Sequence, residues 1–350
     1  MTDGFDPGAF KARVDITLGQ FVARESGRLL TIDPHLRPVA EQLVLATTHG
    51  KRLRAAFCYW GWRAAGQPDS DALVKAAAAM ELVHAAASVH DDIIDDSPLR
   101  HGLPTAHVAL RSALHGRPNR TKSAKALAML VGDLLIGLAG QLFAESGLPA
   151  AFLSRARPLW AVLARELIAG ECLEVIRTGT APDTAESLQV IRYKSAKYTV
   201  EQPLLIGGAL AGANDRLLKV FSAYGLPLGG AFQLRDDLLG LFGDPATTGK
   251  ANLDDLRARR PTALLAETWR RADAGQRKQL RKLISHREPG PEELHEMREL
   301  MHRLESPGHI EKMIVELVDE ATAALAGANM PANATRALTE LAHAATARNH

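Results

Sequence analysis

The sequence predicts an all-α fold for this chain of 350 residues. Apolar residues recur at helical spacing in almost every segment, and no convincing run of alternating apolar and polar residues indicates a strand. Ala and Leu, which both favour helices, dominate the composition. Hydrophobic residues make up 46% of the chain and charged residues 23%, which is sufficient for a sizeable core. We therefore expect one large helical bundle, a single domain over residues 1–350.

Helix boundaries are indicated by residues that start and stop helices. The segment 67–70 (Gln-Pro-Asp-Ser) precedes a helix that we expect to run to about Ser97. Two stretches rich in Gly, Pro and polar residues, 115–123 and 243–261, are predicted loops. Further markers are Asp183 as an N-cap followed by Glu186, Pro291 and Pro307 in first helical turns, and Gly327 and Pro331 between the last two helices.

Charge and cysteine content exclude several classes of protein. A net charge of +2 lacks the basic excess of a nucleic-acid-binding protein, so we expect no nucleic-acid partner. Cys58 and Cys172 have neither the number nor the spacing of a disulfide framework or a zinc site, which fits a cytoplasmic protein. The start of the chain lacks a signal pattern. The longest apolar stretch, 126–144, is interrupted by Gly132 and Asp133, so we expect a buried helix and no transmembrane segment.

The first candidate functional feature is an acidic cluster at the end of an apolar helix, His-Asp-Asp-Ile-Ile-Asp-Asp over residues 90–96. Asp91 and Asp95 lie one turn apart on one face, and His84 lies on the same stripe two turns before Asp91. Four carboxylates so close together repel one another unless cations neutralise them, and carboxylate oxygens suit Mg²⁺. Taken alone, such a cluster fits a solvated helix end better than a metal site.

A second acidic cluster follows another apolar helical stretch, 225–232. Gln233, Asp237 and Asp244 share a helical stripe, and Asp236 lies beside it. Carboxylates that emerge from an apolar helix are costly to bury unless they are paired or bound to metal. Two such helices facing each other predict a cavity with several Mg²⁺ ions that holds a diphosphate.

Basic residues near these clusters provide contacts for a second phosphorylated ligand. Each of them alone fits a solvated surface position, and it is their combination with two acidic clusters that favours anion binding. They are Lys51 and Arg54, Arg100 and His101, Lys194 and Lys197 on one helix face, and Lys250 in the second loop.

Taken together, these segments resemble the trans-isoprenyl diphosphate synthases, or polyprenyl synthetases. The resemblance covers residues 50–262, and its motifs occur in the order of the family. The amino-acid sequence of residues 194–203 is typical of an actinobacterial branch of this family. The matching segments are Gly50-Lys51-Arg52, Asp91 to Asp95, Arg100-His101-Gly102-Leu103-Pro104-Thr105-Ala106-His107, Lys194-Ser195, and Phe232 to Asp244.

The resemblance implies a class I isoprenoid synthase bundle with a central active-site cavity, a homodimer, and three Mg²⁺ ions per site when substrate is bound. Position by position, Asp91 and Asp95 would ligate Mg²⁺ with Asp92 in support, and Asp236 would ligate Mg²⁺ from the opposite helix. Lys51, Arg54 and His84 would bind isopentenyl diphosphate. Arg100, Lys194 and Lys250 would contact the allylic diphosphate, and Ser195 and Gln233 would lie beside the reacting chain.

The sequence departs from the family pattern at several positions. His101 replaces the second Arg of a basic pair and can still donate to a diphosphate, more strongly when protonated. Gly240 replaces the third Asp of the second motif, so one metal contact is lost or moves to Asp244. Conservative departures are Ser195 for Thr, Arg260 for Lys, and Glu171 and Glu174 in a segment that usually reads Gly-Gln-x-x-Asp.

Product length in this family depends on the residues four and five positions before the first Asp. Ala87 and Ala86 occupy these positions, where a bulky aromatic residue would close the pocket early. We therefore expect a C20 product, geranylgeranyl diphosphate. Met80 or a side chain from another helix would set the floor if the product were shorter, and a longer product is a further alternative. The alanines also fit close helix packing.

Other functions remain open from the sequence. A class I terpene cyclase shares the fold and an Asp-rich motif but has no need of Lys51, Arg54 and His84. A non-catalytic partner subunit of a prenyl synthase fits the departures at His101 and Gly240, but not the intact first motif. A plain helical scaffold leaves the ordered motifs unexplained.

Overall fold

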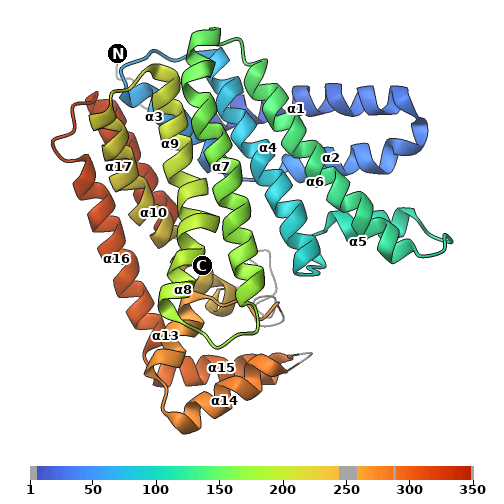
Figure 1. The fold of residues 1–350 in the computed structure, drawn as a ribbon, viewed down its shortest axis with the longest axis vertical. Coiled ribbons are helices and arrows are strands. Elements are labelled where there is room, and N and C mark those ends of the chain that lie inside the picture. The colour runs from blue at the N-terminus through green and yellow to red at the C-terminus, as the bar shows by residue number, and fades with distance from the viewer. Residues whose placement is uncertain (1–5, 244–257, 287–288, 348–350) are drawn as a thin grey trace.

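The computed structural model describes residues 6–243, 258–286 and 289–347. The prediction of an all-α fold is confirmed (Figure 1). The N-terminal half contains α1 (Pro7–Ile32), the 3-10 turn η1 (Pro34–Leu36), α2 (Arg37–Thr48), α3 (Leu53–Ala64), α4 (Asp71–Ile94), β1 (Leu99–Arg100), β2 (Leu103–Pro104), α5 (Ala106–Ala113) and α6 (Arg120–Ala144).

The second half of the described chain is also helical. It contains α7 (Ala150–Arg177), α8 (Thr184–Val190), the π-helix η2 (Ile191–Glu201), α9 (Gln202–Ala211), α10 (Asp215–Phe242), α13 (Ala263–Arg271), α14 (Ala274–Ser285), α15 (Pro291–Arg303), α16 (Ser306–Leu325) and α17 (Ala332–Thr346). Figure 1 shows α4, α7 and α9 running along the length of the molecule, with α13, α14 and α15 gathered at one end.

The buried apolar residues form two clusters that share helices. The larger one lies around α3 and α4, where Ala76, Ala77, Ala78 and Ala79 are all completely buried. A helix that is apolar on every side is expected to lie inside the protein. The smaller cluster joins α13, α14 and α15. Both α10 and α16 contribute residues to each cluster and so tie the two together.

Several predicted helix boundaries are confirmed. The side chain of Asp183 accepts a hydrogen bond from the backbone N–H of Glu186 at 2.9 Å and caps α8. Prolines stand in the first turns of α15 and α16, as predicted for Pro291 and Pro307. The last two helices, α16 and α17, are separated by a segment that contains Gly327 at a φ of 74°.

The helix with the first acidic motif ends at Ile94, three residues earlier than predicted. Asp96 adopts the left-handed conformation, with φ of 53°. The N–H groups of Ser97 and Asp96 bond back to the carbonyls of Asp92 and Ile93, at 3.0 and 3.4 Å. This is a Schellman motif, which satisfies the last carbonyls and turns the chain out of the helix.

A short hairpin follows this turn, although no strand was predicted. β1 and β2 pair antiparallel, Leu99 with Pro104 and Arg100 with Leu103. His101 and Gly102 connect them with φ of 52° and 75°, as a type I′ turn requires. Strands of two residues are too short to show alternation in the sequence.

The predictions for α6 need two corrections. The loop predicted for 115–123 is shorter, because α6 begins at Arg120. The stretch 126–144 was predicted to be buried, but Met129, Leu130 and Ile136 are exposed. By length and composition alone, α4 and α6 could each cross a membrane, but the protein buries 72% of the apolar window of α4 and 44% of that of α6. One face of α6 thus packs against the core while another apolar face stays on the surface.

Candidate active site

The central helix of the candidate site is the π-helix η2, which packs against α7 and α10. Helical segments of π type are rare and occur often at functional sites. Gly170 lets α7 approach η2 closely, because a Cβ at this position would lie only 2.3 Å from the backbone nitrogen of Lys194. The absence of a side chain at Gly170 therefore places Lys194 against the acidic residues of α7.

The first acidic motif faces a group of cationic side chains. Asp91 accepts hydrogen bonds from Lys194 at 2.9 Å, Arg260 at 3.1 Å and Arg100 at 3.3 Å. Arg260 also pairs with Asp95, which confirms that Asp91 and Asp95 share a face. Burial alone would raise the pKa of Asp91, but the positive charges of Arg260, Lys194 and Arg100 hold it well below its ordinary value.

Asp92 makes a different set of contacts. It is 4% exposed and accepts two hydrogen bonds of 3.0 Å from Nε of Arg100 and one of 2.7 Å from Nη2. This bidentate pair fixes the hairpin that follows α4 to the helix itself. Asp92 consequently orients Arg100, whose Nη2 also reaches Asp91.

Lys194 lies among three carboxylates. Besides Asp91 it contacts Glu171 at 3.0 Å and forms a hydrogen bond with Glu174. Burial would lower the pKa of Lys194, but Asp91, Glu174 and Glu171 raise it well above the ordinary value. Burial also raises the pKa of Glu171. Lys194 is therefore a permanent cation between α4 and α7.

The same carboxylates can hold a divalent cation. One oxygen each of Asp91, Glu171 and Glu174 lie within 4.8 Å of one another, and all three residues are half-buried. Hard oxygen donors in this number suit Mg²⁺, which keeps several water ligands and bridges to phosphates. The oxygen chemistry of this set suits a magnesium ion, which would have to displace the Lys194 ammonium that contacts all three carboxylates. Glu171 was not predicted as a site residue, since its position was read only as a departure from Gln.

In the second acidic motif, Asp237 is buried and hydrogen-bonded, whereas Asp236 is only half-buried. Asp237 is 5% exposed, accepts a hydrogen bond from Gln233 Nε2 at 2.9 Å, and accepts another from the backbone of Ala263 at 3.1 Å. It therefore secures the start of α13. Gln233 in turn accepts a bond of 2.6 Å from the hydroxyl of Ser195. Asp236 lies half-buried on α10, while Lys250 and Asp244 fall outside the described residues.

The predicted residues Arg54 and His84 meet at one side chain of η2. His84 Nδ1 lies 3.1 Å from the hydroxyl of Tyr198, and the Arg54 guanidinium lies over the Tyr198 ring, 4.3 Å from its centroid. Arg54 also donates to the hydroxyl of Thr199 at 3.0 Å. Sequence reasoning missed Tyr198 and Thr199, which lie three and four residues after Ser195.

The remaining basic residues near Arg54 and His84 differ in their exposure to solvent. Lys51 is exposed, whereas its neighbour Arg52 is buried and bonds to Asp15 at 2.7 Å. His101 stands at the tip of the hairpin, and its ring centroid lies 5.9 Å from that of His49. Lys51 and His101 are therefore at the surface, where a ligand can reach them.

The two alanines proposed to control product length face different surroundings. Ala86 is completely buried and lies one turn before His90, whose Nε2 bonds to the Met129 carbonyl of α6 at 3.0 Å. Ala87 is half-buried and lies one turn before Asp91. Ala86 consequently packs against α6, and Ala87 lies on the face of α4 that holds the acidic motif.

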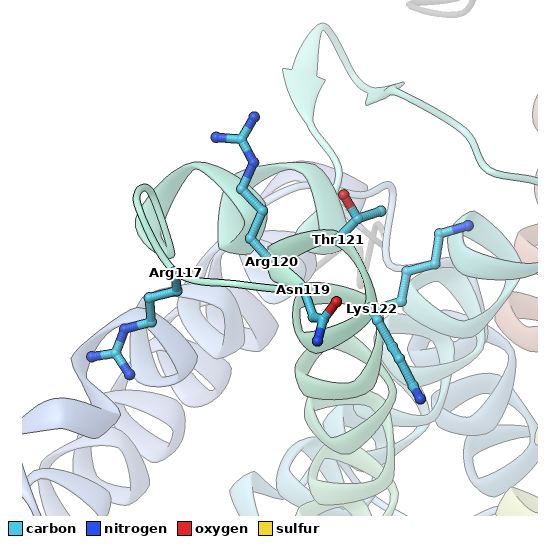
Figure 2. A pocket seen from close by; sticks show the side chains of 6 residues that line it. Arg117, Asn119, Arg120, Thr121 and Lys122 are labelled. Atoms are coloured by element: carbon cyan, nitrogen blue, oxygen red, sulfur yellow. The ribbon is translucent and has the colours of Figure 1, made fainter.

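A separate hollow of about 800 Å³ lies at the start of α6. Arg117, Asn119, Arg120, Thr121, Lys122 and Lys125 line it. Figure 2 shows the labelled Arg117, Arg120 and Lys122 side chains pointing in different directions, so they do not converge on one small anion. Lys125 instead pairs with Asp96 at 2.9 Å.

The fold and the site define an all-helical enzyme that places metal-binding carboxylates beside cations suited to diphosphates. The model of the polyprenyl synthetase family matches residues 34–301, and the chain belongs to this family. It is therefore a prenyltransferase that makes trans-prenyl diphosphates. The family uses a divalent metal held by acidic residues.

Individual relatives agree with this assignment. A geranylgeranyl diphosphate synthase of Saccharolobus solfataricus is 31% identical over 74% of each chain. A (2E,6E)-farnesyl diphosphate synthase of Mycobacterium tuberculosis is 33% identical over 70% of this chain and 66% of its own. The crystal structure of a geranylgeranyl pyrophosphate synthase of Corynebacterium glutamicum with isoprenyl diphosphate and magnesium has a TM-score of 0.94. It is 30% identical, with 99% of this chain and 100% of that chain covered.

Proposed function

We propose that the enzyme condenses isopentenyl diphosphate with allylic diphosphates and releases geranylgeranyl diphosphate. One observation supports two anion subsites side by side: η2 presents Lys194 to Asp91, and one turn later presents Tyr198 to Arg54 and His84. Two diphosphates held at these clusters would bring their reacting carbons together. Such positioning lowers a barrier by up to about 7–11 kcal/mol.

The cluster around Asp91 and Lys194 would hold the allylic diphosphate. Asp91 of α4, Asp95 at the C-cap of α4 and Asp236 of α10 are the proposed ligands of three Mg²⁺ ions. When bound, Mg²⁺ neutralises the negative charge that develops on the departing diphosphate. Lys194 and Arg100 contribute fixed positive charge at the same place, with Lys250 as a further proposed contact. The other end, with Lys51, Arg54, His84 and His101, would hold isopentenyl diphosphate.

The bond changes follow from this arrangement. The C1–O bond of the allylic substrate breaks, and its electron pair leaves with the diphosphate. The double bond of isopentenyl diphosphate then attacks C1, and the new cation loses a proton to the released diphosphate. The hydroxyl of Ser195 donates a hydrogen bond to Gln233 Oε1, which fixes the orientation of both side chains beside this path.

The proposed C20 product rests on the small side chains of α4. Ala87 shares a face with Asp91, so its methyl group leaves room for the growing chain where an aromatic ring would stop it. The relatives include farnesyl, geranylgeranyl and geranylfarnesyl diphosphate synthases, which makes chain length the property to measure.

We further propose that the chain acts as one domain within a cytoplasmic homodimer. Large apolar residues are exposed on two long helices of the monomer, which favours coverage by a second copy. They are Met129, Leu130 and Ile136 on α6 and Ile168, Val175 and Ile176 on α7.

The test is a product assay by mass spectrometry. Purified protein is given Mg²⁺, isopentenyl diphosphate and, in parallel, dimethylallyl, geranyl or farnesyl diphosphate. A C20 diphosphate is expected. A C15 or longer product would keep the reaction and refute the pocket argument. Absence of elongation with every primer would refute the proposal and favour a partner subunit, or a terpene cyclase if a cyclic hydrocarbon appears.

A further inference from the structure

We propose that Tyr198 and Thr199 are positioning residues that fix Arg54 and His84 for the diphosphate of isopentenyl diphosphate. This inference rests on the proposed function of that end of the site. Both residues stand on η2, while Arg54 stands on α3 and His84 on α4. The phenol and the neighbouring hydroxyl thus join three helices at one point.

The hydroxyl of Tyr198 selects the tautomer of His84. Desolvation lowers the pKa of His84 well below its ordinary value, and the positive charges of Arg54 and Arg100 act in the same direction. Desolvation raises the pKa of Tyr198, so the phenol keeps its proton. A neutral imidazole has one N–H and one acceptor nitrogen.

Within the described part of the chain, the phenol hydrogen has no acceptor other than Nδ1 of His84, 3.1 Å away. The phenol is 5% exposed, and a buried donor without an acceptor is costly. Tyr198 therefore donates to Nδ1, and the ring proton resides on Nε2. His84 is left with one N–H donor for an anion while it remains uncharged.

Arg54 is held by two contacts. The Tyr198 ring lies under its guanidinium at 4.3 Å, and the Thr199 hydroxyl accepts from Nη2 at 3.0 Å. A cation over an aromatic face is attracted by the ring quadrupole, most strongly where water is excluded. Because Nη2 and one flat face of the Arg54 guanidinium are engaged, its remaining N–H groups are oriented in advance for a phosphate.

The test compares Tyr198→Phe and Thr199→Val with Tyr193→Phe as a matched control. Tyr193 is on the same helix, but its ring lies near Lys197 instead. Loss of one neutral hydrogen bond corresponds to a change of about fivefold, and loss of one that involves a charged group to at least about tenfold. We expect the KM for isopentenyl diphosphate to rise about fivefold in Tyr198→Phe and at least about tenfold in Thr199→Val. We expect kcat and the KM for the allylic substrate to change less than twofold, and Thr199→Ser to restore the original KM.

A second readout does not depend on turnover. ¹⁵N NMR of the histidine rings should show His84 as the Nε2–H tautomer, and Tyr198→Phe should disturb that signal while Tyr193→Phe should not. An unchanged KM in Tyr198→Phe, or a parallel change of both KM values with a lower Tm, would overturn the proposal. If the original protein elongates no primer, the proposed function fails. The NMR comparison then still decides whether Tyr198 fixes His84.

Discussion

Replacing Gly170 with Ala should displace Lys194 without altering any charge. A Cβ at Gly170 would lie 2.3 Å from the nitrogen and 2.7 Å from the Cα of Lys194, and both belong to rigid backbone. Restoring an ordinary non-bonded separation requires α7 and η2 to move apart by about 1 Å. The displaced backbone is that of Lys194, whose side chain reaches Asp91 at 2.9 Å.

Overpacking of this kind typically costs about 1–3 kcal/mol of stability, and a displacement of about 1 Å in a site costs roughly 100-fold in rate. We expect Gly170→Ala to lower kcat by roughly that factor and to lower Tm in a thermal melt. Gly19→Ala is the control, because a Cβ at Gly19 of helix α1 meets nothing within 4 Å. It should stabilise the protein by about 0.5–1 kcal/mol. Original activity in Gly170→Ala would refute the argument that close packing positions Lys194.

Three further predictions concern α4. Asp95→Asn should lower kcat at least about 100-fold in a Mg²⁺-saturated assay while circular dichroism remains unchanged, since the amide cannot replace a charged metal ligand. Ala87→Phe should shorten the product seen by mass spectrometry, whereas Ala86→Phe should mainly lower Tm, because Ala86 is completely buried against α6. Folding lowers the pKa of His84 below the ordinary value of about 6.5 that it has in the unfolded chain. As the pH falls below 6.5, the unfolded chain therefore binds a proton at His84 that the folded protein does not bind. The contribution of His84 to stability should therefore be complete above pH 6.5 and decline below it, and His84→Gln should flatten this part of the urea-midpoint profile.

The fold class and the first acidic motif could be predicted because their signals are local. Helical spacing of apolar residues acts over a few turns, and the i, i+4 relation of Asp91 and Asp95 holds wherever the segment is helical. Both carboxylates indeed meet Arg260. The same local rule placed Gln233 and Asp237 on one stripe, where they are hydrogen-bonded at 2.9 Å.

Tertiary structure decided the features that sequence spacing did not reveal. The Gly-Lys-Arg segment contains two adjacent cationic residues, and only packing shows that Arg52 is buried against Asp15 while Lys51 is exposed. The contacts of Asp237 with the start of α13 join residues that are far apart in the sequence. The roles of Tyr198 and Thr199 required knowledge that η2 is a π-helix, whose side-chain directions differ from those of an α-helix.

The π-helix η2 is stabilised by close packing against α7 and α10. Gly170 of α7 contacts the backbone of Lys194, and Gly229 and Gly225 of α10 would place a Cβ 2.4 Å from Ala196 and 2.8 Å from Glu201. These three contacts are distributed along η2 from its first turn to its end. An i→i+5 helix is unfavourable in isolation, so close packing on both sides supplies the stability that its own hydrogen bonds do not. The same packing fixes both proposed diphosphate subsites relative to each other, because Lys194 and Tyr198 belong to one constrained turn.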